Sequence, residues 1–119
     1  MTTAAISQDP LYQLLRNDDV AGFNQAIQQG QVCHLAGLDL RGLDLRGLLV
    51  SGMDLTDAYF RGTDLRGIDF RDCCLDGVSL VNSRVSGCYF PPAISAEELR
   101  LSLEFGTRLR HVHTPAENK

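Results

Sequence analysis

The sequence predicts an all-β solenoid, a four-sided β-helix of about three coils with α-helices at both ends. Three observations lead to this fold class. A large apolar residue returns at every fifth position, a turn-favouring residue follows it two places later, and ten-residue segments repeat at an offset of 20. Together they describe a chain that runs extended for a few residues, turns a corner and returns above its starting point.

The five-residue period continues without a break through the middle of the chain. Within each unit, apolar residues lie two positions apart with polar residues between them, which is the inward–outward alternation of a strand. An α-helix cannot hold this pattern, because five residues advance about 140° and would spread the apolar positions over every helix face. The central apolar residues are Leu35, Leu40, Leu45, Val50, Leu55, Phe60, Leu65, Phe70, Leu75, Leu80, Val85 and Phe90.

Each unit ends in a residue that suits a corner. The residue two places after the central one is Gly in eight of the twelve units and Asp, Asn or Pro in the other four. These residues tolerate turn geometry. The residue two places before the central one is never charged and is expected to point inward with it; these residues are Cys33, Leu38, Leu43, Leu48, Met53, Ala58, Thr63, Ile68, Cys73, Val78, Ser83 and Cys88.

The number of units in one coil follows from internal similarity. Residues 41–50 and 61–70, at an offset of 20, are identical at six of ten positions. The same segment has two identities at an offset of 15 and four at an offset of 25. Twenty residues per coil means four units per coil, so residues 33–92 are expected to form three coils, the last of them with the weakest repeat.

Units such as Leu-Asp-Leu-Arg-Gly at 38–42 and 43–47 resemble the A(D/N)LXX repeat of the pentapeptide-repeat family. The resemblance covers residues 33–92 and implies a right-handed quadrilateral β-helix. This chain departs from the usual pattern at the first place of the unit, where Leu, Met, Ile and Cys replace most of the alanines. The departure implies local widening of the coil, or compensation by smaller neighbours.

The ends of the chain carry helix signals, and we expect one domain over residues 1–119. Residues 1–8 are expected to be flexible. Residues 9–30 are expected to form a helical cap, with Pro10 in the first turn of one helix and Asp18 or Asp19 at the start of a second. A capping box formed by Ser95 and Glu98 opens a capping helix over 95–106, and residues 107–119 form a polar tail.

The C-terminal helix has two apolar faces, one with Ile94, Leu101 and Phe105 and the other with Ala96, Leu99 and Leu103. The last coil can cover only one of them. Either the tail folds back and covers the other face with Leu109 and Val112, or a second copy packs there. We favour the homodimer, with Leu101 and Phe105 as candidate contacts.

The sequence carries no catalytic, cofactor-binding or metal-binding motif, so we expect a protein that is not an enzyme. The pair His111 and His113 lacks further ligands, and the Cys73–Cys74 pair is interpreted as one inward and one outward thiol. The formal charge of -4 gives no reason to expect direct nucleic acid or membrane binding. Residues 1–10 lack a signal-peptide pattern, so we expect a cytoplasmic location with reduced cysteines.

Function must then be sought on the surface of the coils. An offset of 20 places Arg41 beside Arg61 and Arg46 beside Arg66 in two columns, with Asp44 and Asp64 between them. We interpret these four arginines as the candidate partner-binding residues. The partner is an unknown protein, and a row of guanidinium groups favours an acidic one. The leading function is a protein-interaction or scaffold module. The alternative, which the family resemblance implies, is a DNA mimic that modulates DNA gyrase.

Overall fold

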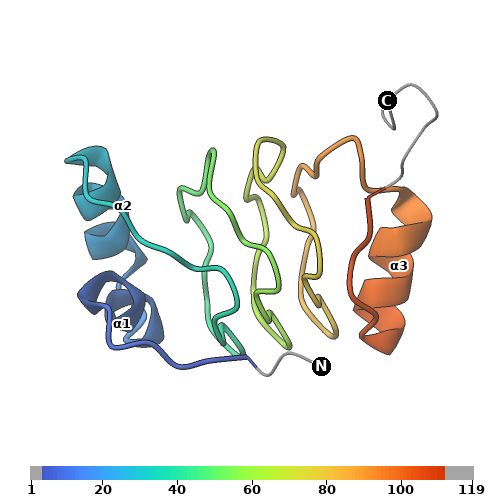
Figure 1. The fold of residues 1–119 in the computed structure, drawn as a ribbon, viewed down its shortest axis with the longest axis horizontal. Coiled ribbons are helices and arrows are strands. Elements are labelled where there is room, and N and C mark those ends of the chain that lie inside the picture. Colours follow the sequence, from blue (N-terminus) through green and yellow to red (C-terminus); the bar gives the residue numbers. More distant parts are fainter. Residues whose placement is uncertain (1–3, 112–119) are drawn as a thin grey trace.

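The computed structural model describes residues 4–111, which occupy about 41 × 30 × 29 Å. Its helices are α1 (Pro10–Arg16), α2 (Val20–Gln28) and α3 (Ala96–Phe105). Helices α1 and α2 lie at one end of the long axis and α3 at the other, with the chain between them winding through stacked coils (Figure 1). No helix in the described range is long and apolar enough to cross a membrane.

Parallel bridges join residues 20 positions apart, which is the predicted period, and residues 33–52, 53–72 and 73–92 are accordingly called the first, second and third coils. The sequence predicts strands, whereas the described residues form no extended strand. Each unit turns a corner after one bridged residue, so pairing is confined to isolated bridges. These bridges join Asp39 to Tyr59, Asp44 to Asp64, Asp54 to Cys74, Tyr59 to Ser79, Asp64 to Arg84 and Asp69 to Tyr89.

The corners are β-turns, and most are closed by a hydrogen bond from one unit to the central carbonyl of the unit before it. Thr63 N–H, for example, donates to Phe60 O at 3.1 Å, and Gly62 between them has φ 64°. Asp57 and Asn82 adopt the same left-handed conformation at φ 61° and 58°. Asn and Asp tolerate this region better than other residues with a side chain, which explains their use at the corners.

The predicted inward register is confirmed by burial. The first ten central residues are at most 2% exposed, while Val85 and Phe90 in the last coil are half-buried. Polar residues at the first place of the unit also point inward and donate to the coil before. Thr63 Oγ1 donates to Leu40 O at 2.6 Å and Cys73 Sγ to Val50 O at 3.0 Å. These bonds let a small polar side chain lie in an apolar interior.

The N-terminal end covers the first coil. Asp9 accepts a hydrogen bond from Leu11 N–H of α1 and Asp19 accepts one from Gly22 N–H of α2. Leu15 and Phe23 are fully buried. Residues 1–8 were expected to be flexible, but Ala5 forms a parallel bridge with Leu38. The open edge of the first coil explains this difference, because its unpaired N–H and C=O groups can bond to a preceding extended segment.

The C-terminal end uses polar contacts that the sequence did not suggest. Ser95 Oγ accepts from Glu98 N–H, but the Glu98 carboxylate binds Arg110 instead of completing the capping box. Ser102 Oγ accepts from Leu80 N–H at 2.9 Å. The sequence predicts a polar tail after the last helix, but Leu109 in that tail is buried. It is 1% exposed and donates its N–H to Val78 O at 2.9 Å.

Candidate protein-interaction surface

One side of the coils gathers positive charge in a chain whose net charge is negative. This basic side consists of residues 41–46, 61–66 and 81–86. It holds the four predicted arginines and one more, Arg84, against two aspartates, which leaves three positive charges. Arg84 extends the column of Asp44 and Asp64, since it forms the bridge with Asp64. The sequence-based prediction omitted Arg84, although its position 20 residues after Asp64 already placed it on this side.

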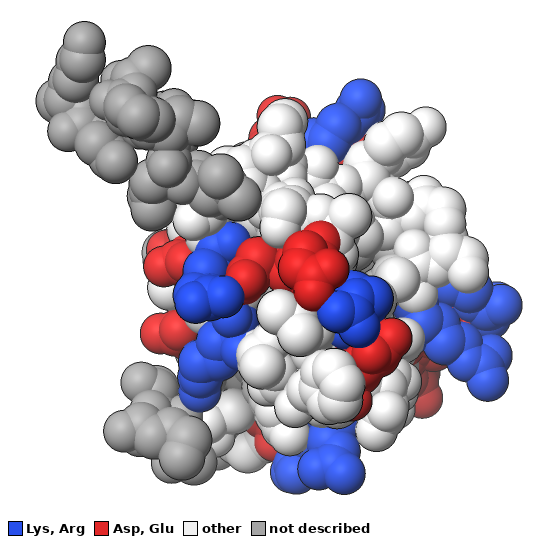
Figure 2. Space-filling model, turned by 90° about the vertical axis from the view of Figure 1, so that its right-hand side faces the viewer, with Lys and Arg blue, Asp and Glu red and all other residues white. Residues whose placement is uncertain are grey.

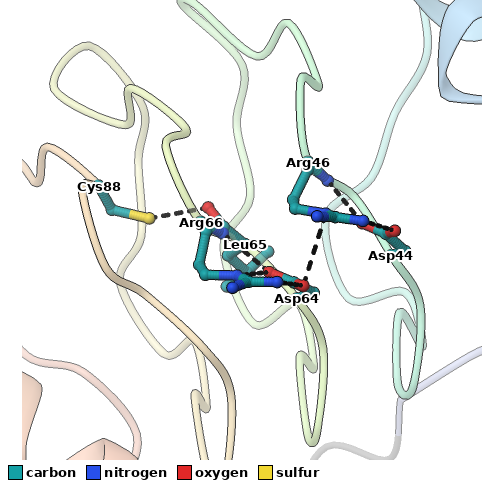
Figure 3. A network of polar contacts seen from close by, with 6 residues as sticks. All are labelled: Asp44, Arg46, Asp64, Leu65, Arg66 and Cys88. Atoms are coloured by element: carbon teal, nitrogen blue, oxygen red, sulfur yellow. Dashed lines mark hydrogen bonds and ion pairs between the residues drawn. The ribbon is translucent and has the colours of Figure 1, made fainter.

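Two of the predicted arginines are held by the aspartate two residues earlier. Asp44 Oδ1 accepts from Arg46 Nε at 2.9 Å and Asp44 Oδ2 from Arg46 Nη2 at 2.7 Å. Asp64 and Arg66 repeat both contacts at the same distances. Arg46 Nε also lies 3.5 Å from Asp64 Oδ2, so this ion pair links the Asp44–Arg46 pair of the first coil to the Asp64–Arg66 pair of the second (Figure 3).

These contacts fix the charge states of the basic side. The hydrogen bond from Arg66 lowers the pKa of Asp64 to about 2, with burial acting in the opposite direction. The hydrogen bond from Arg46 likewise lowers the pKa of Asp44, and each guanidinium has its pKa raised in return. Both carboxylates are therefore ionised at neutral pH, and the surface keeps one charge pattern over the physiological range.

The other two predicted arginines differ from each other. Arg41 forms an ion pair with Asp39 at 3.0 Å, and its guanidinium lies 5.9 Å from the centre of the Tyr59 ring. Arg61 has Tyr59 in place of the aspartate two residues earlier and forms no ion pair with any described residue; the same holds for Arg84. Arg61 and Arg84 are thus the cations of this side whose charge is available to a partner.

The cysteine and histidine side chains are the candidates for thiol chemistry or metal binding that the sequence offers. Cys73 is buried and Cys74 half-buried, as the alternation predicts. Burial raises the pKa of the Cys73 thiol to about 11, which keeps it protonated. No group of three potential metal-ligating side chains occurs in this range. The prediction for His113 falls outside the described residues.

The two predicted faces of α3 have different surroundings. Leu99 and Leu103 pack against the core, while Leu101 is half-buried and Phe105 is 68% exposed. Ile94 does not share the outward face, since it lies before the helix and is 5% exposed. Leu109 covers the last coil and Val112 falls outside the described residues. Leu101 and Phe105 therefore remain the candidate contacts for a second copy.

Comparison with protein families gives one match. A family model described as pentapeptide repeats matches residues 33–72 and 54–90, with eight copies of the repeat. No curated protein and no solved structure matches the chain.

Proposed function

Since the chain belongs to the pentapeptide-repeat family, whose members generally mediate protein interactions, we propose that it is a non-enzymatic protein-interaction module. Its coils form a right-handed quadrilateral β-helix that presents the basic side to an acidic surface of a partner protein. The observation that carries this proposal is that five arginines of the basic side face three aspartates, Asp39 beside Arg41 included, so that Arg61 and Arg84 remain without an ion pair among the described residues in a chain whose formal charge is -4.

The basic side is suited to recognition because its charges are held in place before a partner arrives. The side chains of Arg41 and Arg46 are 58% and 55% exposed while bonded to their aspartates. Holding these long side chains in the free protein lowers the conformational entropy that binding would otherwise cost. Arg61 and Arg84 then supply charge without an internal partner, and guanidinium groups bond carboxylates in a bidentate geometry.

The alternative is a modulator of DNA gyrase that mimics DNA. Such a mimic needs a surface with the negative charge of a phosphate backbone. The interleaved arginines of the basic side favour the acidic-partner proposal over this alternative. Slowed supercoiling by purified gyrase at near-stoichiometric amounts of the protein would reverse that ranking.

The test compares binding of a fluorescent decaglutamate peptide to the wild type and to the double variant Arg61→Glu/Arg84→Glu, at increasing salt. The substitutions break no ion pair, so the fold should be retained. We expect salt-sensitive binding that weakens at least about tenfold in the variant. A control with the same change in net charge places Glu at exposed Gln8, Gln25, Gln28 and Thr107. Equal binding by the wild type and the double variant would refute the basic-side proposal.

We also propose that the outward face of α3 associates with a second copy of the chain. Phe105 is a large apolar side chain at 68% exposure, and Leu101 lies one turn before it on the same face. At this end of the molecule, charges of both signs surround uncharged surface (Figure 2). Two copies related by a two-fold axis would bury both apolar residues of each copy in one contact.

A further inference from the structure

The first and second coils separate on two of their four sides, where residues 33–35 run beside 53–55 and residues 48–50 run beside 68–70 without a main-chain hydrogen bond between them. Between the second and third coils, Phe70 N–H donates to Tyr89 O at 2.8 Å and Tyr89 N–H to Ile68 O at 3.1 Å. The equivalent bonds one coil earlier, at the second of the two separated sides, would join Val50 and Leu48 to Asp69, and neither is present. Val50 N–H, Asp69 N–H, Leu48 O and Asp69 O have no hydrogen-bond partner among the described residues.

The size of the inward residues explains the separation at residues 48–50 and 68–70, but not the one at the other side, where Cys33 lies level with Met53. Where coils are bridged, at least one of the two facing first-place residues is small, as Ala58 is against Leu38 and Thr63 against Leu43. At the side of residues 48–50, Leu48 lies against Ile68, and both are at most 5% exposed. Two large buried side chains at one level keep the two backbones apart, because a close-packed protein interior cannot be compressed to make room for them.

The separation leaves a cavity of about 410 Å³ between residues 47–51 of the first coil and residues 67–69 of the second. One wall is fixed from behind, since Asn24 of α2 bonds to Gly47 O and Leu49 N–H on the opposite edge of the same segment. The volume lies in the range of pockets that hold small ligands or short peptides.

We propose that this cavity, the coil slot, binds an extended peptide segment of a partner protein, which enters as a strand between the first and second coils. The unpaired groups are main-chain donors and acceptors on both walls, and an extended peptide offers the complementary main-chain groups. Asp69 is the one ionisable residue that lines the slot, and Arg71 already pairs with it at 2.7 Å. With Leu49 43% exposed at the same site, the slot favours a segment with uncharged, partly apolar side chains.

The coil slot and the basic side are on different sides of the coils, so the two proposals can fail separately. The probe for the slot is a terminally blocked pentapeptide of alternating threonine and valine, and its control is the same peptide with N-methylated amides. The measurement is amide hydrogen exchange at Val50 and Asp69 in the ¹⁵N-labelled full chain. We expect the unmethylated peptide to slow exchange at both amides at least about tenfold, as main-chain hydrogen bonds would.

A slot-closing variant supplies the second arm. Ile68→Ala removes one of the two large facing side chains, so the coils should bond directly, with Val50 and Asp69 protected and peptide binding lost. Ile68→Val gives a smaller change in the same direction if Ile68→Ala fails to fold. Arg61→Glu/Arg84→Glu should bind the peptide as the wild type does. Unchanged exchange at millimolar peptide, or an equal effect of the N-methylated peptide, would overturn the proposal.

Discussion

Asn24 bonds to the backbone of Leu49 as a neighbouring peptide group would. Its Oδ1 accepts from Leu49 N–H at 2.9 Å, while its Nδ2 donates to Gly47 O at 2.8 Å. Ala5 does the same with main-chain atoms, since it bonds to Gly37 O and Asp39 N–H. The edge of the first coil is thus occupied at these positions by the chain that precedes it, which opposes edge-to-edge association.

Replacing Asn24 should therefore weaken the fold and expose an edge. Asn24→Ala removes two hydrogen bonds to backbone groups, and we expect a loss of about 1–3 kcal/mol in urea unfolding together with larger species in size-exclusion chromatography. Gln25→Ala, at an exposed position on the same helix, is the control and should change neither. Equal stability of Asn24→Ala and the wild type would show that this contact does not protect the edge.

Leu65 tests the register of the coils. Its side chain is 0% exposed, so Leu65→Asp places an unpaired charge in the apolar interior and should cost about 4 kcal/mol, or prevent folding. Leu49→Asp makes the same chemical change at a residue that is 43% exposed and should cost about 0.5 kcal/mol. Thermal unfolding followed by circular dichroism compares the two. Similar losses in both variants would contradict the inward position of Leu65.

The paired aspartates predict the behaviour in acid. The pKa of Asp64 is lowered to about 2 in the folded protein, below its ordinary value of 3.8. A lowered folded pKa stabilises the fold above the ordinary value, and this contribution is lost as the pH falls through the folded pKa. Stability should therefore decline between about pH 4 and pH 2, and Asp64→Asn should flatten that decline. Urea midpoints across this range measure it, with the exposed Asp72→Asn as the control expected to keep the wild-type slope.

The four thiols should react in a fixed order. Burial raises the pKa of Cys33 and of Cys73 to about 11 and also raises that of Cys88, which slows alkylation because the thiolate is the reactive form. Cys74 is half-buried on the outward side, so iodoacetamide at pH 8 should label it first. Peptide mass spectrometry of the native protein reads the order. The Cys74→Ser variant should lose the fast phase, and early labelling of Cys73 would contradict its inward position.

Association through α3 is tested by sedimentation equilibrium. We expect a dimer at tens of micromolar for the wild type and a monomer for Leu101→Lys and Phe105→Lys, because a lysine on each copy would place like charges in an apolar contact. Thr107→Lys, at an exposed position after the helix, is the matched control. A monomeric wild type would exclude the homodimer, and a dimeric Leu101→Lys would move the contact away from this face.

The repeat itself could be predicted from the sequence because its period is short and regular. Leu40 and Phe60, one coil apart, are both buried as expected. A parallel main-chain bridge joins Asp44 to Asp64 at the predicted offset of 20 residues. The ends were less predictable, because their contacts depend on long-range partners. Nothing local to Leu109 shows that the Val78 carbonyl will accept from it, and nothing local to Ser102 shows that the Leu80 N–H needs an acceptor.

In the candidate site too, the positions of residues could be predicted from the repeat, whereas their contacts could not. The columns of arginines followed from the period, but the pairing of Arg46 and Arg66 depends on side-chain geometry around each turn. The scarcity of alanine at the first place predicted local widening, and the side where Leu48 faces Ile68 is one of the two sides where the first and second coils separate. Separation at this side depends on two residues 20 positions apart, which a reading of single units does not compare.

The uneven pairing of the coils has a mechanical consequence. Two bridges join the first coil to the second, and four join the second to the third. These hydrogen bonds run from coil to coil, so tension between the two ends of the molecule loads them along their length and opens them one side at a time. The first junction should rupture at the lower force, releasing α1, α2 and the first coil from the other two coils as the first step of forced unfolding.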